Sequence, residues 1–263
     1  LLDKLMQVSS TLAKVTIVIG LLLISIVFLY FISPIPQWNS YHQFADSRAL
    51  FFINNFGDVA SNVGFFAVGF YGLVTILNKE NFTEKTDIIP YGIFFISIVG
   101  VGFGSAYYHW NPTTETLFWD RLPMSIAFMS FFAAVICDRI DKQYGTFVVL
   151  PILILAGILS LIYWRYTEMI GQGDLRPYGL IQYFPLFAIP VILVLFRRYN
   201  FTSPKYILYA LVWYICAKLF EYLDVVIFKL LGNFVSGHSL KHLAAMFAVM
   251  CIIRMLNNTG GKI

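Results

Sequence analysis

Three of the four histidines in this chain of 263 residues lie in two short motifs. Ser105 and His109 are four residues apart, as are His238 and His242, and Asp120 follows the first motif. Side chains four residues apart share one face of a helix, so each motif can direct both of its polar groups to one point between packed helices. This pattern is typical of a metal site.

The composition places these motifs in a membrane protein. Hydrophobic residues make up 59% of the chain, charged residues make up 12%, and the mean hydropathy is +0.75. Soluble domains contain about 45–50% apolar and about 25% charged residues. We therefore expect an all-α fold, a polytopic transmembrane helical bundle.

Runs without Asp, Glu, Lys or Arg mark the expected spans, because a bilayer core requires about 20 mostly apolar residues per helix. They predict eight helices with approximate ends at 12–32, 58–78, 88–109, 117–137, 146–164, 178–196, 205–228 and 238–256. The expected regions are an N-terminal anchor helix at 1–36, an outer interfacial segment at 37–57 and a seven-helix core at 58–263. The first apolar run is longer than the about 7–15 residues of a signal peptide, so we expect an uncleaved anchor.

Basic residues in the connecting segments set the expected orientation. If the N-terminus is cytoplasmic, eleven basic residues fall in inner segments and four in outer ones, as the positive-inside rule requires. The inner set is Lys4, Lys14, Lys79, Lys85, Arg139, Lys142, Arg197, Arg198, Lys205, Arg254 and Lys262, and the outer set is Arg48, Arg165, Arg176 and Lys229. Both termini should therefore be cytoplasmic, and the motif histidines should face the outer leaflet, on the periplasmic or lumenal side. This topology accounts for the net charge of +4, and no basic cluster suggests nucleic-acid binding.

Three histidines at one depth in the membrane favour zinc as the metal. Neutral imidazole is a common zinc ligand, and three protein ligands leave one position open for water, as in catalytic rather than structural zinc sites. A buried carboxylate such as Asp120 is costly in lipid unless it has a partner or a function.

Taken together, the motifs resemble the alkaline ceramidase family. The strings that carry the resemblance are Gly104-Ser105-x-x-x-His109, Trp119-Asp120-Arg121-Leu122-Pro123-Met124 and Gly237-His238-Ser239-Leu240-Lys241-His242-Leu243. The resemblance covers residues 41–256, and the family belongs to a wider group of seven-helix intramembrane hydrolases that includes the adiponectin and progestin receptors. By position, it implies that His109, His238 and His242 bind zinc. It also implies that Asp120 is the general acid and base and that Ser105 lies beside the bound water and the substrate carbonyl.

The function implied by the resemblance is zinc-dependent hydrolysis of the amide bond of ceramide, a sphingolipid, or of a related N-acyl lipid. The products would be a free fatty acid and an amine, and the expected partners are a lipid substrate in the bilayer and the membrane itself. A seven-helix receptor with a zinc site remains an alternative, and would be marked by a cytoplasmic signalling domain. A transporter, marked by an inverted repeat, has less support. The oligomeric state stays open.

Calcium is not expected, although the eukaryotic ceramidases have an acidic calcium cluster before the first core helix. The comparable stretch here, residues 41–62, contains only Asp46 and Asp58 as carboxylates. Calcium takes about 6–8 oxygen ligands and favours several carboxylates.

Three charged residues lie within the predicted helix at 205–228, spaced three apart. They are Lys218, Glu221 and Asp224. Charges in a span usually face the bundle interior and are paired, so Lys218 and Glu221 are expected to form an ion pair. The three residues are candidates for substrate contact, for a structural role or for a transporter's relay.

Other charges lie near the outer ends of the predicted helices. Asp174 and Arg176 precede the helix at 178–196 and either bind a lipid headgroup or form an ordinary turn. Arg121 is expected to keep the Asp120 carboxylate ionised, and Lys241 is expected to extend outward to the membrane surface.

Overall fold

The computed structural model describes residues 2–77, 82 and 84–259. Lys79 and Lys262, two of the basic residues used to predict the orientation, lie outside the described residues. The described helices are α1 (Leu2–Phe31), η1 (Asn39–His42), α2 (Phe56–Ser61), α3 (Val63–Leu77), α4 (Lys85–Trp110), α5 (Thr114–Arg139), α6 (Lys142–Tyr144), η3 (Gly145–Val149), α7 (Leu150–Met169), α8 (Arg176–Leu195), α9 (Pro204–Tyr222), α10 (Asp224–Leu230) and α11 (Gly237–Thr259). Apart from one isolated β-bridge between Leu50 and Ile53, regular structure in these residues is helical, which confirms the all-α prediction.

Seven helical stretches of the described chain are long and apolar enough to cross a membrane, which confirms a multi-pass membrane protein. They are Ser10–Phe31, Phe56–Leu77, Thr86–Trp110, Thr114–Arg139, Lys142–Met169, Arg176–Leu195 and Gly237–Asn258. The span predicted at 205–228 is not among them. There, α9 ends at Tyr222 and α10 begins at Asp224, so the three charges expected on one helix are divided between two.

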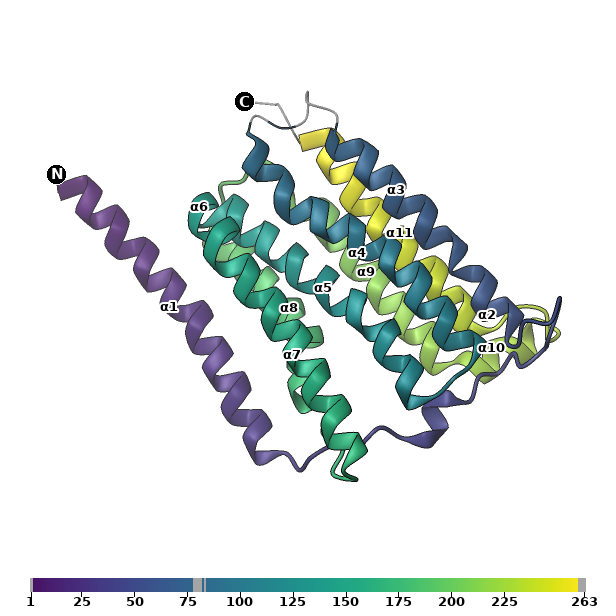
Figure 1. Cartoon of the computed structure of the whole chain (residues 1–263). Coiled ribbons are helices and arrows are strands. Elements are labelled where there is room, and N and C mark those ends of the chain that lie inside the picture. Colours follow the sequence, from purple (N-terminus) through teal and green to yellow (C-terminus); the bar gives the residue numbers. More distant parts are fainter. Residues whose placement is uncertain (1, 78–81, 83, 260–263) are drawn as a thin grey trace.

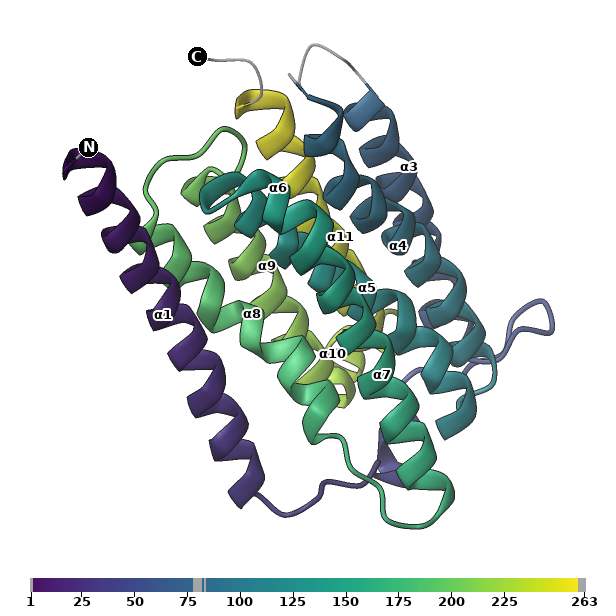
Figure 2. The same cartoon turned by 60° about the vertical axis from the view of Figure 1, so that its left-hand side comes forward.

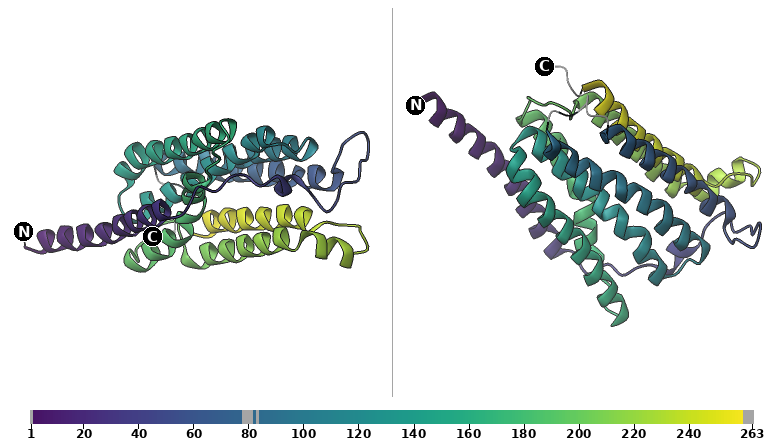
Figure 3. Two further views of the ribbon diagram at one scale, coloured as in Figure 1. Left: turned by 90° about the horizontal axis from the view of Figure 1, so that it is seen from below. Right: turned by 45° about the horizontal axis from the view of Figure 1, so that its top comes forward.

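The helices lie side by side in one bundle, with the start of α1 and the end of α11 at the same end of it (Figures 1 and 2). α4 packs against α3 and α5, and α5 also packs against α7 and α8. α11 packs against α9 and α3, and the views in Figure 3 show α9 and α11 side by side. α9 therefore belongs to the bundle although it is not among the seven candidate spans.

α1 stands at the edge of the bundle and contacts α8 (Figure 2). No residue of its most apolar stretch is buried, but Val15, Val18, Leu21 and Leu22 are partly covered and pack against the core. The segment that follows α1, including η1, crosses the end of the bundle opposite to the start of α1 and the end of α11 (Figure 1). Residues 37–57, for which an interfacial location was predicted, include this crossing segment.

A close contact between α4 and α5 positions the chemically interesting residues. A side chain at Gly104 would overlap the backbone carbonyl of Trp119, so the two helices touch backbone to backbone. Small residues allow such approaches between membrane helices, where packing replaces the hydrophobic effect. α5 begins just before this contact, at a capping box between Thr113 and Thr116. Both features bring the C-terminal end of α4 against the first turns of α5.

We predict that Gly104→Ala destabilises the protein, because its methyl group meets backbone that no side-chain rotation can move. Overpacking of this kind costs about 1–3 kcal/mol, and it should lower the thermal unfolding temperature in detergent. Gly179→Ala in α8 is the matched control, since no atom lies within 4 Å of its Cβ position. Alanine is favoured over glycine in a helix by about 1 kcal/mol, so the control should keep or raise that temperature. Equal unfolding temperatures for the two variants would contradict the close contact.

Candidate metal centre

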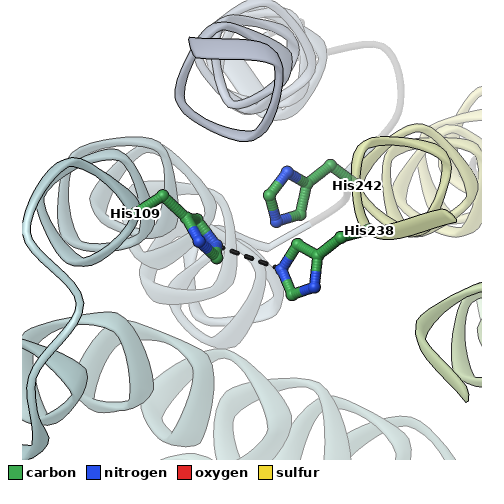
Figure 4. A group of neighbouring side chains, drawn as sticks. All are labelled: His109, His238 and His242. Atoms are coloured by element: carbon green, nitrogen blue, oxygen red, sulfur yellow. Dashed lines mark hydrogen bonds between the residues drawn. The ribbon is translucent and has the colours of Figure 1, made fainter. Parts of the chain in front are cut away.

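Three histidine side chains from two helices meet at one buried point. His109 lies at the end of α4, while His238 and His242 lie in the first two turns of α11. Figure 4 shows the three rings turned toward one another. One ligand atom from each lies within 4.8 Å of the others. The Nε2 atoms of His109 and His238 are 3.2 Å apart, and the three residues are 0%, 5% and 2% exposed in sequence order. The structure thus brings together the three histidines identified in the sequence.

The contacts behind the rings suit metal binding. The Ser61 hydroxyl donates to the carbonyl of Asp58, so it accepts a hydrogen bond from Nδ1 of His242 at 2.7 Å. This bond places the ring proton on Nδ1 and leaves the Nε2 lone pair free, as in metal-binding histidines whose second nitrogen is held by an outer partner. The ring of His109 differs, because its buried Nδ1 has no hydrogen-bond partner among the residues that the structure describes. The donor set and its burial fit a metal ion.

Asp120 and Ser105 lie beside the histidines, at the polar end of a cavity in the bundle. Ser105 lies one helical turn before His109 on α4, and Asp120 lies in the second turn of α5. Both are buried, and the Ser105 side chain interacts with the Asp120 carboxylate. They line the cavity together with His242 and Lys241.

The rest of the cavity is apolar and runs between the helices of the core. Side chains that line it include Phe94, Ile98, Met124, Ile189, Ile207 and Ile252. An apolar pocket with a few polar groups at one end is typical of a ligand site in which an aliphatic chain is buried and the polar groups fix its orientation. The cavity can therefore hold a hydrocarbon chain while its polar end contacts a more polar group.

The segment before α2, residues 37–55, covers the histidine rings and is called the cap segment below. The Phe44 ring centroid lies 4.7 Å from that of His109 and 4.8 Å from that of His238. The side chain of Asn55 donates to the carbonyl of His109 at 2.8 Å. The sequence predicted an interfacial segment at 37–57, but nothing in the sequence marked Phe44 as the residue that lies over the rings.

The fourth histidine, His42, is not part of the group. Its ring nitrogens contact the hydroxyls of Tyr108 at 3.0 Å and Thr114 at 3.1 Å. Burial lowers the pKa of His42, and the positive charge of Arg121 lowers it further. His42 therefore holds the cap segment against α4 and α5 in its neutral form.

A buried hydrogen-bonded group behind His242 was not recognised in the sequence as a unit. Asp58 accepts hydrogen bonds from Ser236 at 2.7 Å and from Ser239 at 2.8 Å. Its neighbour Ser61 holds His242, so these residues join α2 to the start of α11. The sequence signal that could have indicated this group is Asp58, three residues before Ser61 in an otherwise apolar predicted span.

Asp46, the other carboxylate of the stretch compared with the calcium cluster, is occupied by Arg48. The guanidinium of Arg48 binds both carboxylate oxygens of Asp46, each at 2.7 Å. Burial alone would raise the pKa of Asp46, but the hydrogen bonds from Arg48 outweigh it and the pKa is lowered. The carboxylate is thus ionised and already paired with a cation from the chain.

Of the two expectations about the charges beside the motifs, the one about Lys241 is wrong. Arg121 forms no ion pair with Asp120 within the described part of the chain, and its guanidinium lies 4.6 Å from the ring centroid of Trp164. Its charge still acts on the Asp120 carboxylate, so the expectation that it keeps this carboxylate ionised stays a prediction. Successive residues on a helix point in different directions, which separates these two side chains. Lys241 turns inward instead of extending to the membrane surface, and donates to Glu221 at 2.8 Å.

The charges of α9 and α10 have different roles. Lys218 and Glu221 form the expected ion pair, at 2.8 Å. Asp224 instead accepts hydrogen bonds from the backbone N–H groups of Ala45 at 3.0 Å and His238 at 2.8 Å. Asp224 therefore fixes both the cap segment and the start of α11, next to a histidine of the group.

The loop before α8 uses its charges internally. Asp174 and Arg176 pair at 2.8 Å, and Arg176 also donates to the carbonyl of Leu29 at 3.3 Å. Burial would raise the pKa of Asp174, but hydrogen bonds from Arg176 outweigh it and the pKa is lowered. These contacts tie the end of α1 to the bundle. They fit the prediction of an ordinary turn, whereas the alternative of a lipid-headgroup site stays a prediction.

Comparison with known proteins adds one finding. The family model described as Ceramidase matches residues 49–259, which is most of the chain and includes all three histidines, Ser105 and Asp120. No curated protein and no solved structure matches the chain.

Proposed function

The chain belongs to the Ceramidase family, and on that premise we propose that it is a zinc-dependent intramembrane hydrolase. Its substrate is ceramide or a related N-acyl lipid, whose amide bond is cleaved to a free fatty acid and an amine. The observation that carries the proposal is a buried group of three histidines, one of which, His242, lines the polar end of an apolar cavity together with Asp120 and Ser105.

His109, His238 and His242 are the residues that would hold the zinc. Three neutral imidazoles with no fourth protein ligand are the donor set of a catalytic site. When bound, zinc supplies a Lewis acid that polarises a carbonyl oxygen and lowers the pKa of water to about 7. The cavity accounts for the substrate: its apolar part takes the acyl chain, which brings the amide to the polar end.

Asp120 is the proposed general base and general acid. It takes a proton from the attacking water as the water oxygen bonds to the amide carbonyl carbon. It then gives that proton to the amide nitrogen as the C–N bond breaks, so that atoms and charges balance. Its burial beside the cavity keeps bulk water from competing for the proton.

Ser105 is proposed to steady the oxygen of the amide carbonyl. Negative charge develops on this oxygen during the attack, and a hydroxyl donor that is already in place stabilises it. Ser105 is less suited to be a nucleophile, because the base beside it, the Asp120 carboxylate, is the one proposed to take the proton of the attacking water.

We also propose an orientation for the enzyme. The bias in basic residues places both termini in the cytoplasm and the histidine end of the bundle toward the outer, periplasmic or lumenal, leaflet. The start of α1 and the end of α11 lie at one end of the bundle and the cap segment at the other (Figure 1).

The orientation predicts which introduced cysteines react with a membrane-impermeant thiol reagent. Phe52→Cys in the cap segment, where the side chain is 100% exposed, should be labelled in intact membranes. Asn200→Cys, exposed between α8 and α9, should be labelled only after the membrane is opened. The reverse pattern would show that the histidine end faces the cytoplasm.

The mechanism predicts that Asp120→Asn lowers turnover by about 10²–10⁴, because the amide keeps the shape but cannot accept the proton. Ser105→Ala should lower it by about 10- to 1,000-fold, as expected for one donor to the developing negative charge. The assay is release of fatty acid from ceramide and other N-acyl lipids in detergent, with metal content measured in parallel and expected to stay unchanged.

Asp141→Asn is the matched control for this assay. Asp141 is exposed and caps α6 through the backbone N–H of Tyr144, a role that asparagine can fill. Its activity should equal that of the parent. If Asp120→Asn is as active as the parent, the mechanism is wrong. If the parent binds zinc and cleaves no N-acyl lipid, the receptor alternative replaces the hydrolase.

A further inference from the structure

Three cations lie at the histidine end of the bundle. The guanidinium of Arg121 lies 5.3 Å from the ring centroid of Tyr41. Lys218 and Lys241 lie on either side of Glu221, 2.8 Å from it, and within electrostatic range of the same tyrosine. Tyr41 belongs to the cap segment, so the three cations lie beneath that segment and beside the candidate metal centre. They come from α5, α9 and α11 respectively.

Two carboxylates among the described residues contact or act directly on the two lysines. Glu221 lies between the lysines and pairs with each of them at 2.8 Å. Asp120 is the second carboxylate that acts on Lys241. Within this set of direct partners, three cations against two carboxylates leave one positive charge in excess, before any metal is counted.

Arg121 is the least satisfied of the three. It is 6% exposed, its Nη1 atom has no hydrogen-bond partner, and among the described residues its neighbours are the aromatic rings of Tyr41, Trp164 and Tyr178. Rings stabilise a cation only partly, and a buried cation without a counter-ion is costly.

Lys241 connects this excess charge to the cavity. It lines the cavity together with Ser105 and Asp120, opposite to the apolar lining that would take an acyl chain. In the structure its ammonium also contacts Nε2 of His238 at 3.1 Å. That nitrogen faces the other two histidines, so a metal that uses its lone pair leaves the ammonium in need of another acceptor.

We propose that the cluster of Arg121, Lys218 and Lys241 binds an oxyanion on the amine half of the lipid substrate. The oxyanion is a carboxylate or a phosphate close to the amide bond, as in an N-acyl amino acid or a phosphorylated ceramide. The inference rests on the proposed function, since it names the class of lipid cleaved at the same site. A purely structural ion pair requires only one lysine beside Glu221. It would not account for the presence of the second lysine or of Arg121.

The reaction keeps the balance of ordinary amide hydrolysis. Water adds its oxygen to the acyl carbon, the C–N bond breaks and the nitrogen receives the proton. The oxyanion takes no part in these steps, so Lys218 and Lys241 are substrate-binding residues. Removing either lysine should weaken binding and raise KM more than it lowers kcat.

The test compares pairs of lipids that share one acyl chain and differ in charge. One pair is an N-acylglycine and the N-acylethanolamine, and the other is a ceramide 1-phosphate and the ceramide. The parent should favour the anionic member of one pair by about 10- to 100-fold in kcat/KM, the range for a hydrogen bond to a charged group. The pair that shows this preference identifies a carboxylate or a phosphate as the recognised group.

Lys241→Met and Lys218→Met should reduce the preference to less than about threefold, mainly through KM. Each leaves Glu221 paired with the other lysine. Lys205→Met is the control, because Lys205 is exposed at the start of α9, far along the helix from Lys218. Equilibrium binding of the same lipids to Asp120→Asn, with and without each lysine substitution, provides a readout that does not depend on turnover.

The outcomes separate the inference from the proposed function. If the neutral lipids are cleaved and no anionic lipid is preferred, the inference is wrong and the hydrolase stands. If no N-acyl lipid is cleaved, the proposed function fails, and the binding measurements still decide whether the lysines recognise the oxyanion. If the lysine variants lose affinity for free fatty acid but not for the anionic lipids, the cluster serves the product, and the inference is overturned.

Discussion

The burial of three imidazole rings against one another is the constraint on which the rest of this structure depends. His109 and His238 direct Nε2 atoms toward each other at 3.2 Å, a contact that suits either a hydrogen bond between the rings or a cation that both lone pairs bind. The proposed zinc ion would use the lone pairs of all three rings. The geometry requires the end of α4 and the start of α11 to meet at one depth. Gly104 permits the neighbouring contact of α4 with α5, and Asp224 fixes the start of α11.

The same constraint divides the bundle into two chemical environments. Near the histidines, several polar groups pair with one another: Asp58 with two serines, Glu221 with two lysines, and Asp46 with Arg48. Away from them, the cavity is lined by aromatic and aliphatic side chains. A lipid amide suits this division, because its acyl chain and its polar half require the two environments side by side. The cap segment, with Phe44 over the rings, shields the polar end from outside.

Much of this arrangement was predictable from the sequence, for two physical reasons. Apolar runs of about 20 residues have few alternatives to a spanning helix, which identified seven of the stretches found. Histidines four residues apart must share a helix face, which identified the His238 and His242 pair, and span limits brought His109 to the same depth.

The directions of the long charged side chains were not predictable from the sequence. Lys241 has enough length to reach either the membrane surface or Glu221, and the sequence does not show that α9 places Glu221 within its reach. Arg121 follows Asp120 directly, yet the helix turns it toward aromatic rings from α7 and α8. The break between α9 and α10 also depends on tertiary packing, because Gly237 brings the start of α11 against the backbone of Phe220 and Asp224.

The central claim is that His109, His238 and His242 hold one zinc ion, and the most direct test is the metal content of purified variants. The parent should contain about one zinc per chain, as expected for a single site with three histidine ligands. His238→Ala and His242→Ala should each lose most of it, since each removes one of the three ligands. His42→Ala should retain it, because that ring binds Tyr108 and Thr114 instead. Zinc content that is unchanged in both His238→Ala and His242→Ala would contradict the account.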